Sequence, residues 1–134
     1  MKSNELRIGN FVRYAAETQY VHAITRTGVE VDGLAIKFED VSPIDLTEEW
    51  LLKFGFDLSK SNKHIYITYA TYGIFSVVKY DKSKIVEEYK HLNHDDYIVV
   101  YNQCADECSF YNFKYVHQIQ NIYFALTGEE LTLK

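Results

Sequence analysis

Turn signals divide the first 42 residues of the chain into short segments of alternating side chains. Asp32-Gly33 is a residue pair typical of two-residue β-hairpin loops, and Gly9-Asn10 marks an earlier turn. Between such turns apolar and polar residues alternate, as in strands that bury one face. About four short strands joined by tight turns predict a small antiparallel (SH3-like) barrel or curled sheet.

A short helix is predicted over residues 47–54, after Pro43 ends the strand pattern. The hydroxyl of Thr47 suits the helix N-terminus, and Gly55 suits its end. The apolar residues of this segment recur at three- and four-residue spacing, which gives the helix one face to bury. Trp50 is the expected anchor of that face.

The second half predicts a second antiparallel sheet followed by a helix. Its β-branched and aromatic runs predict four strands at residues 64–69, 73–80, 97–101 and 110–113. Apolar residues then recur with helical spacing over residues 115–127, where Gly128 supplies a stop.

The expected fold class is therefore α+β, with the second sheet covered on one face by the C-terminal helix. We expect a β-barrel-like module at residues 1–42 and an α+β module at residues 43–134. The sequence leaves open whether the two modules share one continuous core.

Charge and hydropathy disfavour nucleic-acid-binding, membrane and secreted proteins. The net charge of −5 provides no basic face for tracking phosphates, which disfavours nucleic-acid binding by bulk electrostatics. No apolar run approaches the roughly 20 residues that span a bilayer, and the N-terminus lacks the apolar segment of a signal peptide. We expect a cytoplasmic protein with reduced cysteines and no membrane association.

Tyrosine is unusually frequent, at 12 of 134 residues. The candidate binding residues are the tyrosines in and beside the predicted second sheet, namely Tyr66, Tyr69, Tyr72, Tyr80, Tyr97, Tyr101 and Tyr111. Exposed tyrosines contact protein partners or stack on single-stranded bases, whereas buried ones pack the core. The negative charge favours a protein partner. The nucleic-acid alternative requires nearby lysines to cluster beside exposed tyrosines, namely Lys79, Lys82, Lys84 and Lys90.

A loose metal-ligand pattern is the main candidate for chemistry. His91, His94, Cys104 and Cys108 are residue types that bind zinc, although their spacing differs from that of zinc modules. The ordinary interpretation is a solvated loop and a hairpin turn. No nucleophile motif, phosphate-binding loop or dinucleotide fingerprint is present. We therefore expect no cofactor and favour a non-enzymatic role, with a metal-dependent enzyme as an alternative.

Three segments of the chain resemble a family of small proteins found in phages and integrated mobile elements of gut bacteria. They are residues 4–12 (NELRIGNFV), residues 43–56 around the predicted short helix, and residues 115–131 (YVHQIQNIYFALTGEEL). No activity is established for that family, so the resemblance implies only a phage-derived, cytoplasmic context. Residues 57–113, which hold most of the tyrosines, have no counterpart in it.

These observations favour an accessory protein that binds a host protein without catalysis, for example as an inhibitor of a host or defence factor. A nucleic-acid-binding module with an aromatic sheet is the second hypothesis, and a metal-dependent enzyme is the third. A homodimer formed through an edge strand of either sheet is also open.

Overall fold

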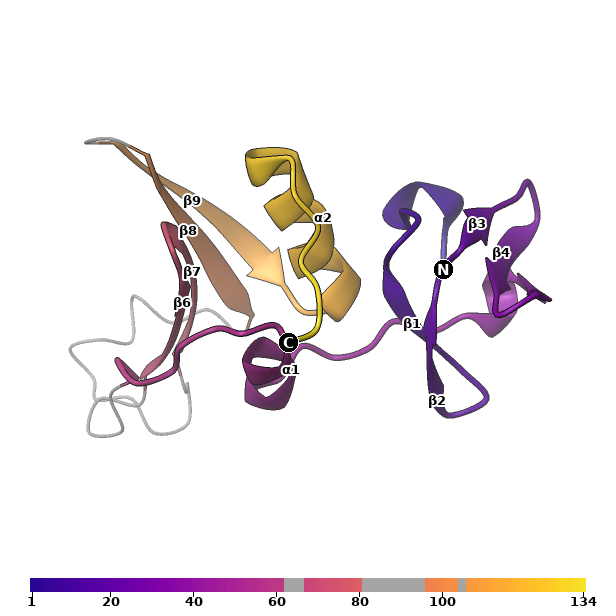
Figure 1. The fold of residues 1–134 in the computed structure, drawn as a ribbon, viewed down its shortest axis with the longest axis horizontal. Helices are drawn as coiled ribbons and strands as arrows, with labels where there is room; N and C mark the ends of the chain where they lie inside the picture. The colour runs from indigo at the N-terminus through magenta and orange to yellow at the C-terminus, as the bar shows by residue number, and fades with distance from the viewer. Residues whose placement is uncertain (62–66, 81–95, 104–105) are drawn as a thin grey trace. The chain divides into compact units, whose positions relative to one another are not determined.

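The computed structural model of the chain describes residues 1–61, 67–80, 96–103 and 106–134. Within these residues the fold is α+β, with three antiparallel sheets, a short helix α1 and a longer C-terminal helix α2 (Figure 1). The predicted fold class is thereby confirmed. No helix among the described residues has both the length and the apolar character needed to cross a membrane.

The chain forms two compact units. The first consists of Met1–Leu46 with Tyr115–Leu131, and the second of Thr47–Lys114 with Thr132–Lys134. Helix α2 therefore groups with the N-terminal strands, from which it is separated by the whole second sheet in sequence. The division into modules at residues 1–42 and 43–134 stays a prediction.

The first unit holds two small sheets. One pairs two strands, β1 (Phe11–Tyr14) and β2 (Glu17–Tyr20). The other pairs three strands, β3 (Ala23–Ile24), β4 (Gly28–Val31) and β5 (Leu34–Lys37). Short 3-10 turns, η1 (Ser3–Glu5) and η2 (Phe38–Asp40), flank them. The two sheets do not close into a barrel, so the curled-sheet form of the prediction holds.

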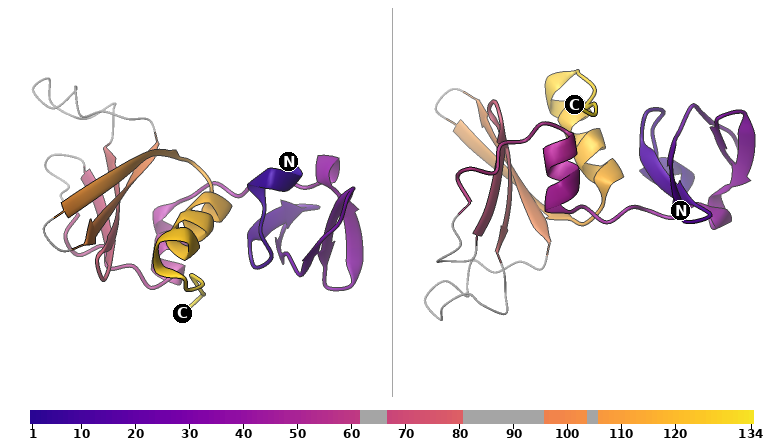
Figure 2. Two further views of the ribbon diagram at one scale, coloured as in Figure 1. Left: turned by 90° about the horizontal axis from the view of Figure 1, so that it is seen from above. Right: turned by 60° about the horizontal axis from the view of Figure 1, so that its bottom comes forward.

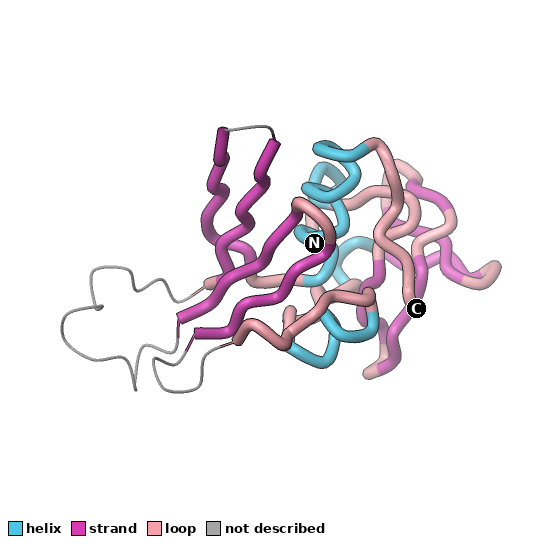
Figure 3. The backbone as a smooth tube through the Cα atoms, turned by 60° about the vertical axis from the view of Figure 1, so that its left-hand side comes forward, coloured by secondary structure: helices cyan, strands magenta, loops and turns pink. Residues whose placement is uncertain are grey.

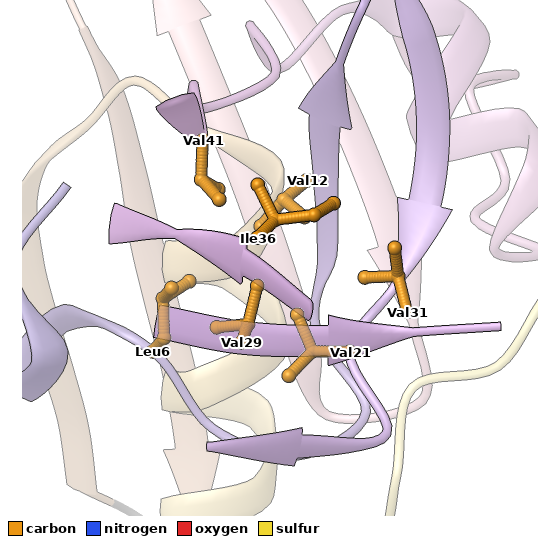
Figure 4. Close-up of a cluster of buried hydrophobic side chains, with 7 residues drawn as sticks. All are labelled: Leu6, Val12, Val21, Val29, Val31, Ile36 and Val41. Atoms are coloured by element: carbon orange, nitrogen blue, oxygen red, sulfur yellow. The ribbon is translucent and has the colours of Figure 1, made fainter. Parts of the chain in front are cut away.

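Seven aliphatic side chains form the core of these sheets (Figure 4). Val12, Val29, Val31 and Ile36 lie in strands, where side chains alternate between the two faces, and this period-2 pattern is visible in the sequence. Each fully buried aliphatic side chain contributes about 1.5–3 kcal/mol of transfer free energy. The cluster consists of Leu6, Val12, Val21, Val29, Val31, Ile36 and Val41.

Two hairpin turns place residues at positive φ. The predicted turn at Asp32-Gly33 is present, with φ values of 45° and 79°. A second turn, at Ala15 and Ala16, has φ values of 50° and 66°, although alanine rarely adopts this region. Because no glycine or asparagine marks it, the sequence did not predict this turn. β2 ends at Tyr20 and β3 begins at Ala23, so residues 21 and 22 separate the two strands.

Helix α2 (Val116–Thr127) has the predicted bounds within one residue. Gln118 accepts a hydrogen bond from the backbone N–H of Tyr115 at 3.0 Å, and Gly128 ends the helix at φ 76°. Val116 and Ile119 are fully buried, and the helix contacts β1. The backbone of Val116 also donates to the carbonyl of Ile44 at 2.9 Å, which fixes the start of the helix to the first unit.

Helix α1 (Glu48–Lys53) lies in the second unit. The hydroxyl of Thr47 accepts a hydrogen bond from the N–H of Trp50, as the sequence predicted for a helix N-terminus. The buried anchors are Leu51 and Phe54, both fully shielded from solvent, whereas Trp50 is only partly buried. The expected main anchor, Trp50, is therefore corrected to Leu51 and Phe54, which are three residues apart and share the buried face of the helix.

The second unit also contains a twisted sheet of four antiparallel strands, visible from three directions in Figures 2 and 3. Its strands, in spatial order, are β6 (Ile67–Tyr72), β7 (Phe75–Tyr80), β8 (Tyr97–Gln103) and β9 (Asp106–Phe113). Four strands were predicted, although their bounds differ by several residues. The register shifts between Tyr97 and Val99, where Asn112 in β9 has a φ of 70°.

Candidate functional site

Of the predicted binding tyrosines, the structure describes the side chains of Tyr72, Tyr97 and Tyr101. Tyr72 in β6 and Tyr101 in β8 are both register partners of Phe75 in β7. All three lie on the face of the sheet that buries Val77 and Val99. Tyr69 in β6 pairs with Val78, and Tyr80 in β7 pairs with Ile67. Tyr111 lies beside the register shift in β9, and Tyr66 lies outside the described residues.

The described tyrosine side chains of this sheet are wholly or partly buried. Tyr97 is 5% exposed, and its burial, together with the charge of Glu48, raises its pKa to about 12. The amine of Lys79 lies 5.0 Å from the centre of the Tyr97 ring. Tyr72 is half-buried, with its ring 5.5 Å from that of Phe56. Partner binding through the tyrosines of this sheet stays a prediction.

The predicted metal ligands fall mostly on segments outside the described residues. His91, His94 and Cys104 belong to those segments. Cys108 is described, and it is exposed in β9 opposite Tyr101. Within the described part of the chain, no three histidine, cysteine or acidic side chains converge as a metal site would require. Of the four lysines required by the nucleic-acid hypothesis, Lys82, Lys84 and Lys90 also lie outside it.

An exposed row of aromatic rings lies on the first unit instead, on the outer face of the β1–β2 hairpin. Phe11 and Tyr20 are register partners, and their rings meet edge to face at 5.5 Å. The ring of His22 continues the row, 5.0 Å from that of Tyr20. Tyr20 is 42% exposed, although large aromatic side chains tend to be shielded. We call Phe11, Tyr20 and His22 the aromatic row.

Charged groups border the aromatic row at both ends. His22 faces the carboxylate of Asp32, with 3.4 Å between Nε2 and Oδ1. At the other end, a Cβ on Gly9 would lie 3.4 Å from the Tyr20 hydroxyl and 3.5 Å from the Glu130 carboxylate. Both distances are ordinary van der Waals contacts, so what favours glycine at this position is its φ of 96°. Arg7 pairs with Glu130.

Buried amide side chains fix the backbone beneath the aromatic row. Gln120, only 1% exposed, accepts a hydrogen bond from the N–H of Phe11 and donates one to the carbonyl of Gly9, both at 2.9 Å. Asn10 is fully buried and donates to Oδ1 of Asn121 at 2.8 Å. Asn121 in turn donates to the carbonyl of Glu5 at 3.1 Å. Buried polar groups satisfied in this way hold a single local conformation.

Sequence reasoning missed the aromatic row because it missed β2. Once the Ala15-Ala16 turn is known, the two-residue loop sets the register that puts Phe11 opposite Tyr20. The alternation of Phe11 with Val12 was the available signal, since Val12 belongs to the core and its neighbours face outward. The tyrosine count drew attention to the second sheet instead.

His117, on α2, is a buried histidine without an evident chemical role. It is 3% exposed, its ring stacks on that of Tyr115 at 5.8 Å, and its Nδ1 has no hydrogen-bond partner among the described residues. Burial lowers the pKa of His117, against a smaller opposing effect of the Glu5 charge. The side chain is therefore held in its neutral form.

The neutral state of His117 predicts acid sensitivity of the first unit. In the unfolded chain the histidine takes up a proton near pH 6.5, whereas the folded state resists it until a lower pH. The unfolded state then binds more protons, so the contribution to stability is complete above about pH 6.5 and falls as pH decreases. Urea unfolding at a series of pH values should show this loss.

A His117→Gln variant provides the comparison, because glutamine does not titrate in this range. We expect its stability to depend less on pH between about 7 and 5 than that of the unmodified protein. If stability depends equally on pH in His117→Gln and in the unmodified protein, groups other than His117 cause the acid sensitivity. His22→Gln, at an exposed position of the same unit, is the matched control for replacement of a histidine.

Comparison of the whole chain with known proteins adds no relative: no family model, no curated protein and no solved structure matches it.

Proposed function

We propose that this chain acts without catalysis, by binding another protein through the aromatic row of the first unit. The observation that carries the proposal is the exposed Tyr20 ring, held between Phe11 and His22 on an outer sheet face. Tyrosine is enriched at protein interfaces because it offers a large, rigid contact area with a polar tip.

The fixed backbone beneath the row supports the same proposal. The hydrogen bonds from Gln120 to Gly9 and Phe11 hold the start of β1 in place before any partner arrives. Rings that are already ordered lose little conformational entropy on binding, so more of their contact energy remains as affinity. A surface of this kind suits recognition, and no chemical step is required of it.

The resemblance to proteins of phages and mobile elements suggests the setting. In that setting the partner is a host protein met in the cytoplasm, and inhibition of a host or defence factor is the form of the proposal to test first. The mildly acidic character of the chain, with a net charge of −5, is consistent with a protein partner rather than nucleic acid.

The test is capture of partners from host-cell lysate by the immobilised full chain, at low and high salt. We expect Tyr20→Ala to weaken capture of a stoichiometric protein by about tenfold or more, because aromatic anchors often contribute 2 kcal/mol or more. Ile74→Ala is the matched control. Ile74 is a large apolar residue of the second unit, 52% exposed, and its loss should leave capture unchanged.

The outcomes of this capture experiment distinguish protein binding from nucleic-acid binding. A protein captured equally by the unmodified chain and Tyr20→Ala would move the binding surface away from the aromatic row. Nucleic acid retained at low salt and released at high salt would replace the proposal with the nucleic-acid reading, since phosphate contacts weaken with salt.

A further inference from the structure

We infer that the partner contributes an extended, basic segment that adds as a strand to the outer edge of β2. The inference rests on the proposed function, because it identifies what would lie beside the aromatic row. Strand addition draws affinity from main-chain hydrogen bonds and specificity from alternate side chains.

Hydrogen bonds on the far side of the hairpin show which backbone groups of β2 face outward. In β1, the N–H of Phe11 donates to Gln120 and the N–H of Arg13 donates to the carbonyl of Ser42. Both residues of β1 therefore direct their N–H groups away from β2. In an antiparallel pair, residues opposite such positions also direct theirs away from the partner strand.

The register partners of these residues are Tyr20 and Thr18. Their N–H and C=O groups consequently point to the outer edge of β2. Neither amide donates a hydrogen bond to any group in the described part of the chain. An open edge of this kind is a template for a further strand unless a charge or proline protects it. β2 has no proline, and its one charged residue is Glu17 at its start, so Thr18, Gln19 and Tyr20 carry no charge.

The charges along this edge favour a basic occupant. Residues 17–25 contain no lysine or arginine, while Glu17 begins β2 and is exposed. Asp32 lies at the other end, beside His22, and is also exposed. The first unit as a whole has nine acidic and five basic side chains. A basic segment gains attraction from Glu17 and Asp32 at the two ends of the edge, whereas the exposed cation Arg13 lies across the hairpin, opposite Thr18.

The aromatic row supplies the contact for alternate side chains of the added strand. Thr18 and Tyr20 lie on the same outer face, since side chains two residues apart point the same way. A lysine or arginine of the occupant beside Tyr20 would place its apolar stem and its charge against the ring. A second copy of this chain offers the same acidic edge, so charge disfavours self-pairing.

The test uses the full chain and a synthetic probe. The probe is a peptide of alternating lysine and valine, about ten residues long, followed by NMR of the protein amides. We expect saturable shifts centred on Thr18 and Tyr20 below about 1 mM peptide, with slower hydrogen exchange at both amides. A peptide of alternating glutamate and valine should produce neither effect.

Two substitutions at one position separate the backbone from the side chain. Thr18→Pro removes the outward N–H but leaves the bonds to β1, because the lost donor does not serve the hairpin. We expect it to weaken peptide binding by about tenfold. Thr18→Val keeps the N–H and should bind like the unmodified chain. Unchanged amide dispersion away from β2 will show that both variants fold.

Several results would overturn the inference. They are the absence of saturable shifts, shifts centred away from β2, equal binding of the acidic peptide, equal binding by Thr18→Pro, and association of the chain with itself through β2. The proposed function fails separately. If a lysate protein requires Tyr20 but binds Thr18→Pro normally, partner binding through the aromatic row stands and strand addition does not.

Discussion

Replacing Phe54 with alanine is expected to lower the stability of the second unit by about 3–5 kcal/mol. Phe54 is fully buried at the end of α1, and its ring contacts that of Trp50 at a centroid distance of 5.7 Å. A helix of six residues is unstable by itself in water, so α1 depends on this buried side chain. The substitution removes apolar contacts and leaves a cavity.

Urea unfolding followed by tryptophan fluorescence measures this effect directly. Trp50 is the only tryptophan of the chain and belongs to the same helix, so its emission reports the environment of α1. Leu52→Ala is the matched control, because Leu52 is on the same helix but 56% exposed. We expect a change of about 0.5 kcal/mol or less for the control. Similar losses in the two variants would contradict the buried role of Phe54.

Replacing Gln120 with leucine is expected to destabilise the first unit by about 2–4 kcal/mol, although leucine is apolar and of similar size. The glutamine satisfies the N–H of Phe11 and the carbonyl of Gly9. Leucine would leave both groups buried and unpaired, at about 1–3 kcal/mol each, against a smaller gain from burying apolar surface. The pattern of helical spacing in the sequence does not reveal this cost.

Two measurements identify the mechanism. Hydrogen exchange of the Phe11 amide should accelerate strongly in Gln120→Leu, because its acceptor is lost. Thermal unfolding followed by circular dichroism gives the change in stability. Gln19→Leu serves as the control, since Gln19 is partly exposed on β2 and should change stability little. Unchanged protection of the Phe11 amide in Gln120→Leu would refute the proposed support.

The same hydrogen bonds connect stability to binding. Phe11 forms one end of the aromatic row, and Gln120 holds its backbone from the opposite side. A variant that folds but loses this support should therefore bind a partner more weakly, through greater disorder of the row rather than loss of a contact. Gly9 supports the same segment through its φ of 96°, which residues with a side chain rarely adopt.

Local sequence signals determined most of the secondary structure. The Asp32-Gly33 pair specified a hairpin because glycine tolerates positive φ, and Thr47 and Gly55 bounded α1 because they satisfy its free backbone groups. The three- and four-residue spacing specified α2. These features depend on residues close together in the chain, so they can be read without knowledge of the rest of the fold.

Tertiary structure decided which surfaces remain exposed. Tyr97 and Tyr20 belong to the same residue type in strands, yet the first is buried and the second exposed, because burial depends on what packs over each face. The Ala15-Ala16 turn likewise has no local signal, since alanine rarely adopts positive φ. The sequence thus determined the α+β class and most of the elements, with β2 as the exception. Contacts between distant residues, above all Gln120 with Gly9 and Phe11, decided the site, since short-range patterns do not record them.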